Sequence, residues 1–242
     1  MTLKLITGCN EKYLNRIQPF LGSLEKHADF PVIFVGVGFK PDGKNGVELT
    51  HEQNAGSPYQ TQSIQHGSFL QVVDAKPTDV LLMTDGDLFM QRPMNDDEKK
   101  LMKLKHGEVC VGWNGGPDET LLIESGRLSP TMAMERMFAL WGEDLMRQKP
   151  IYNVGCIAMT AKTWQQVYDY YMGRWADAIE TFNHQARQQW LISYAIAKIE
   201  LKVKHMPWSF HAHGHFGLKP GMERRPDGIY VDGEKALFKH FL

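Results

Sequence analysis

The stretch VLLMTDGDLFMQRP, residues 80–93, decides the fold of this chain. Its first four residues, Val80–Met83, are apolar and predict a buried strand. Two aspartates separated by one glycine follow this strand, Asp85 and Asp87. Ligands of open α/β sheets bind outside the carboxyl ends of the strands. The stretch therefore predicts a ligand site immediately after this strand.

The two aspartates suit the binding of a divalent cation. Carboxylates at positions i and i+2 can hold one hard cation from one side, and Gly86 between them allows the backbone a close approach. Such a cation bridges to phosphate oxygens and neutralises the charge on a leaving diphosphate. The alternative is that Asp85-Gly86 only begins a turn after the strand. The motif by itself leaves both interpretations open.

Outward from this stretch, apolar runs alternate with apolar residues at helical spacing. Strands are predicted at Leu3–Thr7, Val32–Val37, Val109–Trp113 and Cys156–Met159. Helices are predicted over residues 13–24, 64–73, 137–145, 164–171 and 190–199. This alternation predicts an α/β fold, a mixed sheet with a mostly parallel core and helices on both faces. No linker interrupts the chain, so we expect one domain over residues 1–242.

The composition of the sequence changes from Met206 onward, where His, Gly and Pro become frequent. The chain closes with the strand-like residues Ile229–Val231, a turn at Asp232-Gly233, and Ala236–Phe238. This pattern is typical of a hairpin or of an arm that folds back. We expect residues 206–242 to form a C-terminal arm that closes over the site.

The composition is that of a soluble globular protein. Of the 242 residues, 43% are hydrophobic and 23% are charged, and the net charge of −1 provides no general attraction to nucleic acid or to an anionic membrane. No run of about 18 apolar residues occurs, so no membrane span is expected. Cys9, Cys110 and Cys156 form no CxxC pair, which indicates neither a disulfide framework nor a thiolate zinc site. The first apolar run is too short for a signal peptide, so we expect a cytoplasmic protein.

A second set of candidate ligands lies in HMPWSFHAHGHFGLKP, residues 205–220. His211, His213 and His215 alternate, so in an extended segment they share one face. Imidazole binds Zn²⁺ and Mn²⁺-like ions, and one histidine added to two aspartates gives three protein ligands. Lys219 adds a positive charge that suits a phosphate. The alternative is a histidine-rich surface loop, or buried histidines that bond to the backbone.

Taken in order, these segments resemble the glycosyltransferase-A fold, and within it the family-8-like enzymes of the glycogenin and galactosyltransferase type. The segments that carry the resemblance span about residues 3 to 220. They are the first strand with Thr7 and the following Tyr13, similar to the strand and tyrosine that bracket a uracil ring; TDGD at 84–87, similar to the DxD motif; Tyr152-Asn153-Val154-Gly155, similar to an Asn-Ser-Gly element; Gln188-Gln189, similar to an Asp-Gln pair that opens a helix; and the His/Gly/Lys-Pro tail, similar to an HxxGxxKP ending.

The resemblance implies a set of roles for these residues. It implies Mn²⁺ or Mg²⁺ as the cofactor, a nucleotide-sugar donor, expected to be a UDP-sugar, and a hydroxyl acceptor. The implied metal ligands are Asp85, Asp87 and His213; the implied nucleotide contacts are Thr7, Tyr13, Asp85 and Lys219; and Asn153 and Gln189 are the implied catalytic positions facing the donor sugar or the acceptor.

The sequence also departs from the family pattern. Gln188 stands where the family usually has aspartate, and Val154 replaces a serine. His213 is taken first as the metal histidine because its spacing to Lys219 fits, whereas His211 has the family spacing only to the glycine at 214. No residue is marked as a catalytic base, because glutamine cannot serve as one.

Two other functions remain open from the sequence. The histidines and aspartates suit a metal-dependent hydrolase, in which zinc activates a water molecule. A non-catalytic nucleotide-sugar binder, which keeps the fold and has lost turnover, fits the same residues.

Overall fold

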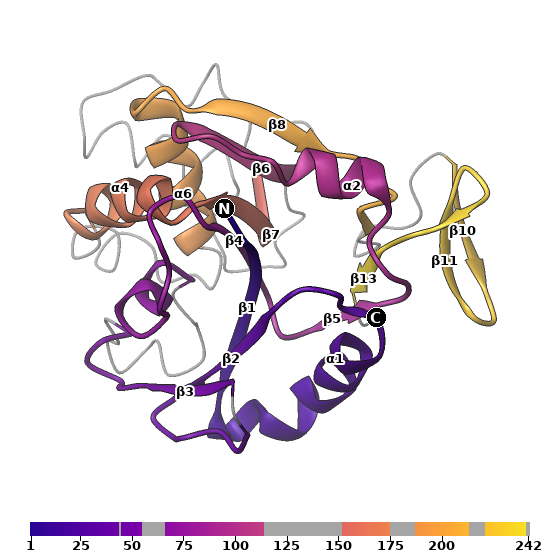
Figure 1. The fold of residues 1–242 in the computed structure, drawn as a ribbon, viewed down its shortest axis with the longest axis horizontal. Helices are drawn as coiled ribbons and strands as arrows, with labels where there is room; N and C mark the ends of the chain where they lie inside the picture. The colour runs from indigo at the N-terminus through magenta and orange to yellow at the C-terminus, as the bar shows by residue number, and fades with distance from the viewer. Residues whose placement is uncertain (44, 55–65, 114–151, 175–186, 213–220, 241–242) are drawn as a thin grey trace, which may run out of the picture.

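A seven-stranded sheet forms the centre of the protein, seen here in a computed structural model that describes residues 1–43, 45–54, 66–113, 152–174, 187–212 and 221–240 (Figure 1). The strand order is β3-β2-β1-β4-β7-β6-β8. In chain order these strands are β1 (Leu3–Asn10), β2 (Val32–Val37), β3 (Gly46–Leu49), β4 (Val80–Thr84), β6 (Glu108–Trp113), β7 (Tyr152–Thr160) and β8 (Lys202–Met206).

Most neighbouring strands of this sheet are parallel. β1 runs parallel to β2 and β4, β2 to β3, and β6 to β8, whereas β7 runs antiparallel to both β4 and β6. The predicted mixed sheet with a mostly parallel core is confirmed. The reversed direction of β7 has a consequence for the site, because it brings the amino end of β7 to the edge where β1 and β4 have their carboxyl ends.

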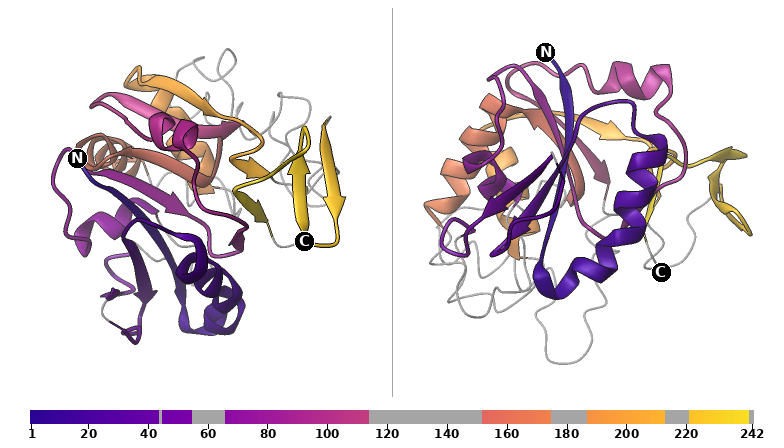
Figure 2. Two further views of the ribbon diagram at one scale, coloured as in Figure 1. Left: turned by 45° about the vertical axis from the view of Figure 1, so that its right-hand side comes forward. Right: turned by 60° about the horizontal axis from the view of Figure 1, so that its bottom comes forward.

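Helices cover both faces of the sheet (Figure 2). α1 (Leu14–His27) packs on one face, while α4 (Ala161–Met172), α6 (Arg187–Lys198) and the 3₁₀ helix η3 (His66–Gln71) pack on the other. The short η1 (Glu11–Tyr13) precedes α1, and α2 (Asp96–Leu101) lies between β4 and β6 in the chain.

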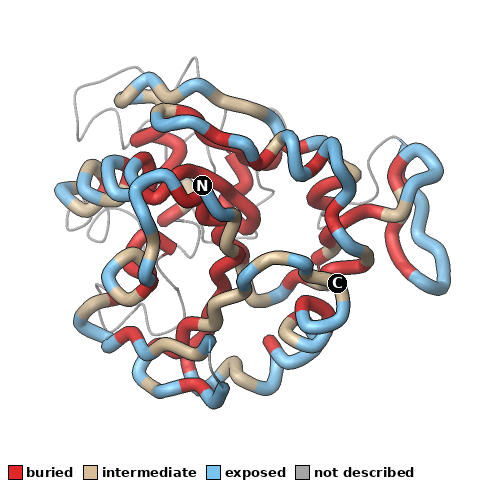
Figure 3. The backbone as a smooth tube through the Cα atoms, viewed as in Figure 1, coloured by how far each residue is buried: buried red, intermediate tan, exposed pale blue. Residues whose placement is uncertain are grey.

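Strand β4 shows why the central apolar run is continuous. Leu81 and Met83 belong to the core cluster that includes Trp164 of α4, whereas Leu82 belongs to the opposite cluster with Phe20 of α1. Successive side chains of a strand point to opposite faces, so a strand covered on both faces must be apolar at every position. All of β4 is buried, and buried residues run along the central strands (Figure 3).

One predicted helix is a 3₁₀ helix in the structure and not an α-helix. The sequence predicts a helix over residues 64–73, and the described part of it is the 3₁₀ helix η3. Gly67 in this segment lies so close to α4 that an added Cβ would come within 2.3 Å of Tyr168 Cδ2 and 2.5 Å of the Tyr171 hydroxyl. The tight 3₁₀ geometry and the missing side chain together allow this approach. The helix predicted over 137–145 lies outside the described residues.

The C-terminal segment forms two small sheets. β10 (Met222–Arg225), β11 (Gly228–Val231) and β12 (Glu234–Lys235) make an antiparallel sheet. Asp232 and Gly233 connect β11 to β12 with φ values of 50° and 84°, the left-handed conformation that a two-residue hairpin turn requires. The predicted strand and turn are therefore present, but the strand that pairs across the turn is Glu234–Lys235 and not Ala236–Phe238.

The chain then returns to the main body. β13 (Phe238–His240) lies between β5 (Leu88–Met90) and β9 (His211–Ala212), antiparallel to β5 and parallel to β9. The last described strand thus pairs with the strand that directly follows the two aspartates. No helix within the described ranges has the length and apolarity needed to cross a membrane.

Candidate functional site

Asp85 and Asp87 lie immediately beyond the carboxyl end of β4, as the sequence predicts. The hydroxyl of Thr7, at the neighbouring position of β1, donates to the carbonyl of Thr84 over 3.1 Å. The backbone N–H of Asp85 donates to the carbonyl of Gly155 in β7 over 2.9 Å. The backbone of Asp85 is therefore held between the ends of two neighbouring strands. Thr7 itself is fully buried and contributes here by joining strand ends.

Each aspartate is exposed to solvent on one side and contacts a buried histidine on the other. The side chain of Asp85 is 46% exposed, and its Oδ1 lies 3.2 Å from Nε2 of His66 in η3. The side chain of Asp87 is 58% exposed, and its Oδ1 lies 3.6 Å from Nδ1 of His240 in β13. Both histidines are buried, at 2% and 5% exposure. Accessible carboxylate oxygens with buried support suit a hard divalent cation.

The described part of the chain holds only part of the predicted metal site. Within it, no group of three or more His, Cys, Asp or Glu side chains is arranged to hold a metal ion. His213, the predicted third ligand, lies outside the described residues, as does Lys219. The two aspartates therefore fit a cation as carboxylate ligands, and the third ligand stays a prediction.

Two glycines permit close contacts around the aspartates, one with Asp85 and one with α1. An added Cβ at Gly155 would lie 2.7 Å from Oδ2 of Asp85 and 3.0 Å from Oδ1 of Asn153. An added Cβ at Gly86 would lie 2.9 Å from Cδ1 of Ile17 in α1. Gly155 thus sets the position of the Asp85 carboxylate, and Gly86 allows the turn to pack on α1.

Asn153 and Gln189 lie on two neighbouring elements, β7 and α6. Asn153, at the start of β7, accepts a hydrogen bond at Oδ1 from the backbone N–H of Gly155 over 2.9 Å. Gln189 is half-buried in α6, and its carbonyl accepts from the hydroxyl of Ser193 over 2.8 Å. The same Ser193 hydroxyl accepts from the backbone N–H of Tyr152 over 3.0 Å. Ser193 therefore couples the first turn of α6 to the start of β7.

Gln188, the departure from the family pattern, has a structural role. Its Oε1 accepts the backbone N–H of His66 over 2.6 Å, and the side chain is buried. This bond joins α6 to η3 at the histidine that contacts Asp85. The glutamine therefore supports one aspartate indirectly.

Tyr13 is half-buried at the end of η1 and packs against the cluster that includes α1. The guanidinium of Arg16 lies 5.3 Å from its ring centroid and the ammonium of Lys12 lies 5.9 Å from it. A half-buried ring with cations beside it is compatible with both predicted roles of Tyr13, core packing and ring stacking.

The three cysteines are buried thiols and supply no ligand to the site. Burial raises the pKa of Cys156 well above its usual range, with smaller contributions in the same direction from Cys110 and Asp85. Burial also raises the pKa of Cys110 to about 12. Thiolates bind metals and act as nucleophiles, whereas these groups remain neutral thiols near pH 7.

The sequence does not predict the contacts of the two buried histidines with the aspartates. His66 lies in a predicted helix that could face the nucleotide, but nothing in the sequence around it distinguishes it from an ordinary buried residue. His240 has one weak signal, since it alternates with the apolar Phe238 in a strand and therefore shares its buried face. This signal does not identify the aspartate that His240 contacts.

Neither a protein-family model nor a curated protein sequence matches this chain. Solved glycosyltransferase structures are similar to it. The galactosyltransferase LgtC, in complex with donor and acceptor sugar analogues, has a TM-score of 0.59 and 10% identity, with 98% of this chain and 86% of LgtC covered. An active-site glutamine-to-glutamate variant of LgtC has a TM-score of 0.59 and 11% identity, with 98% and 86% covered. Apo mouse xyloside xylosyltransferase 1 has a TM-score of 0.56 and 8% identity, with 100% of this chain and 98% of that chain covered.

These similarities extend over nearly the whole chain and identify its fold as glycosyltransferase-A. The fold implied by the resemblance in the sequence is confirmed.

Proposed function

We propose that this protein is a metal-dependent glycosyltransferase that moves a sugar from a nucleoside-diphosphate donor, expected to be a UDP-sugar, to a hydroxyl acceptor. One observation supports it above all others. In a chain with the glycosyltransferase-A fold, Asp85 and Asp87 follow the carboxyl end of β4 two residues apart, and both carboxylates are exposed. In open α/β sheets this is the edge where ligands bind.

In this proposal Asp85, Asp87 and His213 hold Mn²⁺ or Mg²⁺. When bound, such a cation neutralises the charge that a departing diphosphate develops. Asp85 approaches the ligand with its backbone held by Gly155, and the buried His66 supports its carboxylate from behind. A ligand group held this rigidly needs little reorganisation during the reaction.

The remaining residues position the donor and the acceptor. Tyr13 stacks on the base beyond the end of β1. Thr7, inside β1, holds that strand to the last residue of β4. Lys219 adds positive charge beside the diphosphate. Asn153 and Gln189 face the donor sugar or the acceptor. The hydroxyl of Ser193 links their two segments, because it bonds to the carbonyl of Gln189 and to the backbone N–H of Tyr152.

The whole chain, residues 1–242, acts as one catalytic domain in this proposal. Residues 206–242 are the arm that closes over the site. The return of β13 to β5, beside Asp87, supports this assignment.

The decisive experiment measures UDP binding by calorimetry with and without Mn²⁺. The expected result is binding that depends on Mn²⁺ in the wild type and loses that dependence in Asp87→Asn. Asp42→Asn is the matched control, because Asp42 is an exposed aspartate in the segment between β2 and β3. Metal-dependent binding that survives in Asp87→Asn contradicts the proposed site.

Turnover then separates the three functions that the sequence leaves open. A transferase site stabilises the leaving diphosphate without its acceptor, so slow release of UDP from one UDP-sugar in a panel is expected, with none from Asp85→Asn. Release of inorganic phosphate or UMP instead indicates the hydrolase. Tight metal-dependent UDP binding without any release across the panel indicates the non-catalytic binder.

A further inference from the structure

The C-terminal strand β13 places a buried histidine between the second aspartate and a histidine of the tail. In the pairing with β5, His240 lies opposite Leu88, the residue after Asp87. In the pairing with β9, Phe238 lies opposite His211. His240 and Phe238 share one face of the strand, and His211, opposite Phe238, lies on the same face.

The distances connect three side chains in series. Nε2 of His240 lies 2.7 Å from Nε2 of His211, with the ring centroids 4.8 Å apart. Nδ1 of His240 lies 3.6 Å from Oδ1 of Asp87. The first distance is a hydrogen bond, and the second is a contact slightly longer than one. Each nitrogen of the His240 ring therefore faces a polar side chain.

From this geometry we propose that His240 is a positioning residue for Asp87, with its tautomer set jointly by Asp87 and His211. The proposal rests on the proposed function in taking Asp87 as a metal ligand. Between two neutral imidazoles, one nitrogen must donate and the other accept. If Nε2 of His211 donates, His240 carries its proton on Nδ1 and presents an N–H to Asp87. The opposite arrangement would direct a lone pair at the carboxylate, which repels it.

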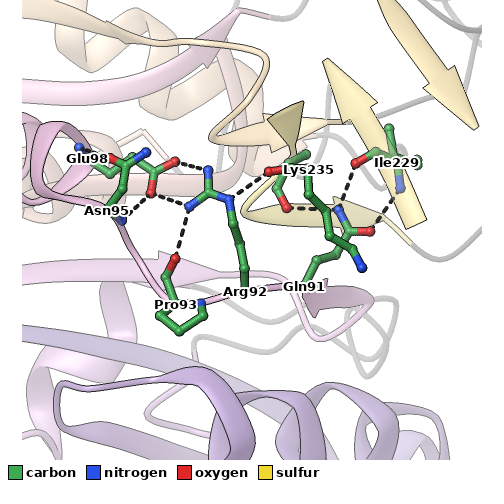
Figure 4. Close-up of polar contacts among 8 residues, drawn as sticks. Gln91, Arg92, Pro93, Asn95, Glu98, Ile229 and Lys235 are labelled. Carbon is green, nitrogen blue, oxygen red and sulfur yellow. Dashed lines mark hydrogen bonds and ion pairs between the residues drawn. The ribbon is translucent and has the colours of Figure 1, made fainter. Parts of the chain in front are cut away.

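The surrounding contacts keep β13 in place. Gln91, just after β5, donates from Nε2 to the carbonyl of Ala236 over 2.9 Å and to that of Ile229 over 3.2 Å, and its Oε1 accepts the N–H of Ile229 over 2.9 Å (Figure 4). The backbone N–H of Gln91 donates to the carbonyl of Leu237 over 2.8 Å. One buried side chain thus ties the strand that follows Asp87 to the segment that precedes His240.

Arg92 makes a second set of contacts with the C-terminal segment, next to those of Gln91. Arg92 donates from Nε to the carbonyl of Lys235 over 2.7 Å, and its two terminal nitrogens lie 2.8 and 2.6 Å from the carboxylate oxygens of Glu98 (Figure 4). Glu98 is itself fixed in a reciprocal cap with Asn95 at the start of α2. Such paired arginine–carboxylate bonds have a defined geometry. The C-terminal arm is thus fastened to the segment that begins at Asp87, and His240 keeps its position behind that carboxylate.

Two substitutions separate the two contacts of His240. Asparagine carries its amide nitrogen at the position of imidazole Nδ1, whereas glutamine carries its own at the position of Nε2. His240→Asn therefore keeps the contact with Asp87 and loses that with His211, and His240→Gln does the reverse. Lys239→Ala is the matched control, because Lys239 is the half-buried neighbour on the other face of the same strand.

The first readout is the Mn²⁺-dependent affinity for UDP, with thermal melting to establish that each variant folds. Loss of an outer partner of a metal ligand weakens metal affinity by about 10- to 100-fold, so His240→Gln is expected to lose about tenfold or more. His240→Asn and Lys239→Ala are expected to stay near the wild type. Equal affinities for folded His240→Gln and the wild type, alongside loss in Asp87→Asn, overturn the positioning role and leave the proposed function intact.

The second readout requires neither metal nor nucleotide. Long-range ¹H–¹⁵N NMR of the wild type reports which ring nitrogen of each histidine carries the proton, and the signals missing from His240→Asn assign His240. The expected state is Nδ1–H at His240 and Nε2–H at His211. An Nε2–H tautomer at His240 overturns the proposal. The expected tautomers in a protein without Mn²⁺-dependent binding support the His211–His240–Asp87 series and contradict the proposed function instead.

Discussion

Nε2 of His66 lies 3.2 Å from Oδ1 of Asp85, and this contact brings η3 into the site. The histidine is buried, whereas the carboxylate that it touches is 46% exposed. A buried donor behind an exposed carboxylate restrains its rotation while leaving its outer oxygen lone pairs accessible. The site therefore depends on a residue that does not itself reach the solvent.

Replacement of His66 tests this support. His66→Leu should weaken Mn²⁺-dependent UDP binding by about tenfold, the scale on which outer partners of metal ligands act. His66→Gln should retain most of the affinity, because its amide nitrogen reaches the position of imidazole Nε2. Calorimetric titration of UDP at saturating Mn²⁺ measures both. The same affinity for His66→Leu and His66→Gln would show that the contact does not matter for binding.

Gln188 offers a test of stability. Gln188→Leu should lower the free energy of unfolding by about 1–3 kcal/mol, because the backbone N–H of His66 loses its buried acceptor. Gln18→Leu is the exposed control in helix α1 and should unfold near the wild type. Urea denaturation followed by circular dichroism compares the variants. Wild-type stability in Gln188→Leu would mean that the N–H finds another acceptor.

Gly155 allows a test of whether UDP binding depends on the position of the Asp85 carboxylate. In Gly155→Ala the new Cβ would lie 2.7 Å from Oδ2 of Asp85, so the carboxylate must move. We expect Mn²⁺-dependent UDP affinity to fall by about tenfold, as for other disturbances around a metal ligand.

Gly22→Ala is the matched control for Gly155→Ala. Gly22 lies inside α1, and an added Cβ there would meet nothing within 4 Å. This substitution should leave UDP binding unchanged and raise stability by about 0.5–1 kcal/mol, the usual advantage of alanine over glycine in a helix. Unchanged binding in both variants would show that Asp85 tolerates the displacement.

Asp79 should make stability depend on pH. Burial by itself raises the pKa of its carboxyl, but hydrogen bonds from the backbone N–H groups of Thr2 and Lys76 and from the Lys4 ammonium outweigh this effect, so the net pKa is lowered. A lowered pKa in the folded state stabilises the protein at pH values above the ordinary carboxyl pKa of about 3.9. This contribution is lost as the pH falls through the lowered value in the folded protein.

The corresponding variant is Asp79→Asn. It should reduce the free energy of unfolding at pH 7 by about 1–3 kcal/mol, because the charged acceptor of three hydrogen bonds is lost. The difference from the wild type should be constant between pH 6 and 8 and shrink below about pH 4. Urea denaturation at a series of pH values measures it, with Asp42→Asn as the exposed control. A difference that does not change with pH would exclude a contribution from ionised Asp79.

The sequence by itself determined the location of the central strands and of the acidic turn. Val32–Val37 is both the predicted and the observed β2, and the predicted strand at Val80–Met83 is β4, which ends directly before Asp85. These features are readable because burial on both faces requires apolar side chains at consecutive positions of one strand. The hairpin turn at Asp232-Gly233 is readable for a similar local reason, since few residues adopt its left-handed backbone.

Only the tertiary structure decided what stands behind the aspartates. β7 runs antiparallel to β4, and this direction brings Asn153 to the site. β13 returns to pair with β5, and this pairing brings His240 to Asp87. Strand direction and long-range pairing depend on how distant segments pack together, and the residues that meet at the site carry no local mark of their partners. A buried histidine has the same immediate sequence context whether it supports a metal ligand or only fills the core.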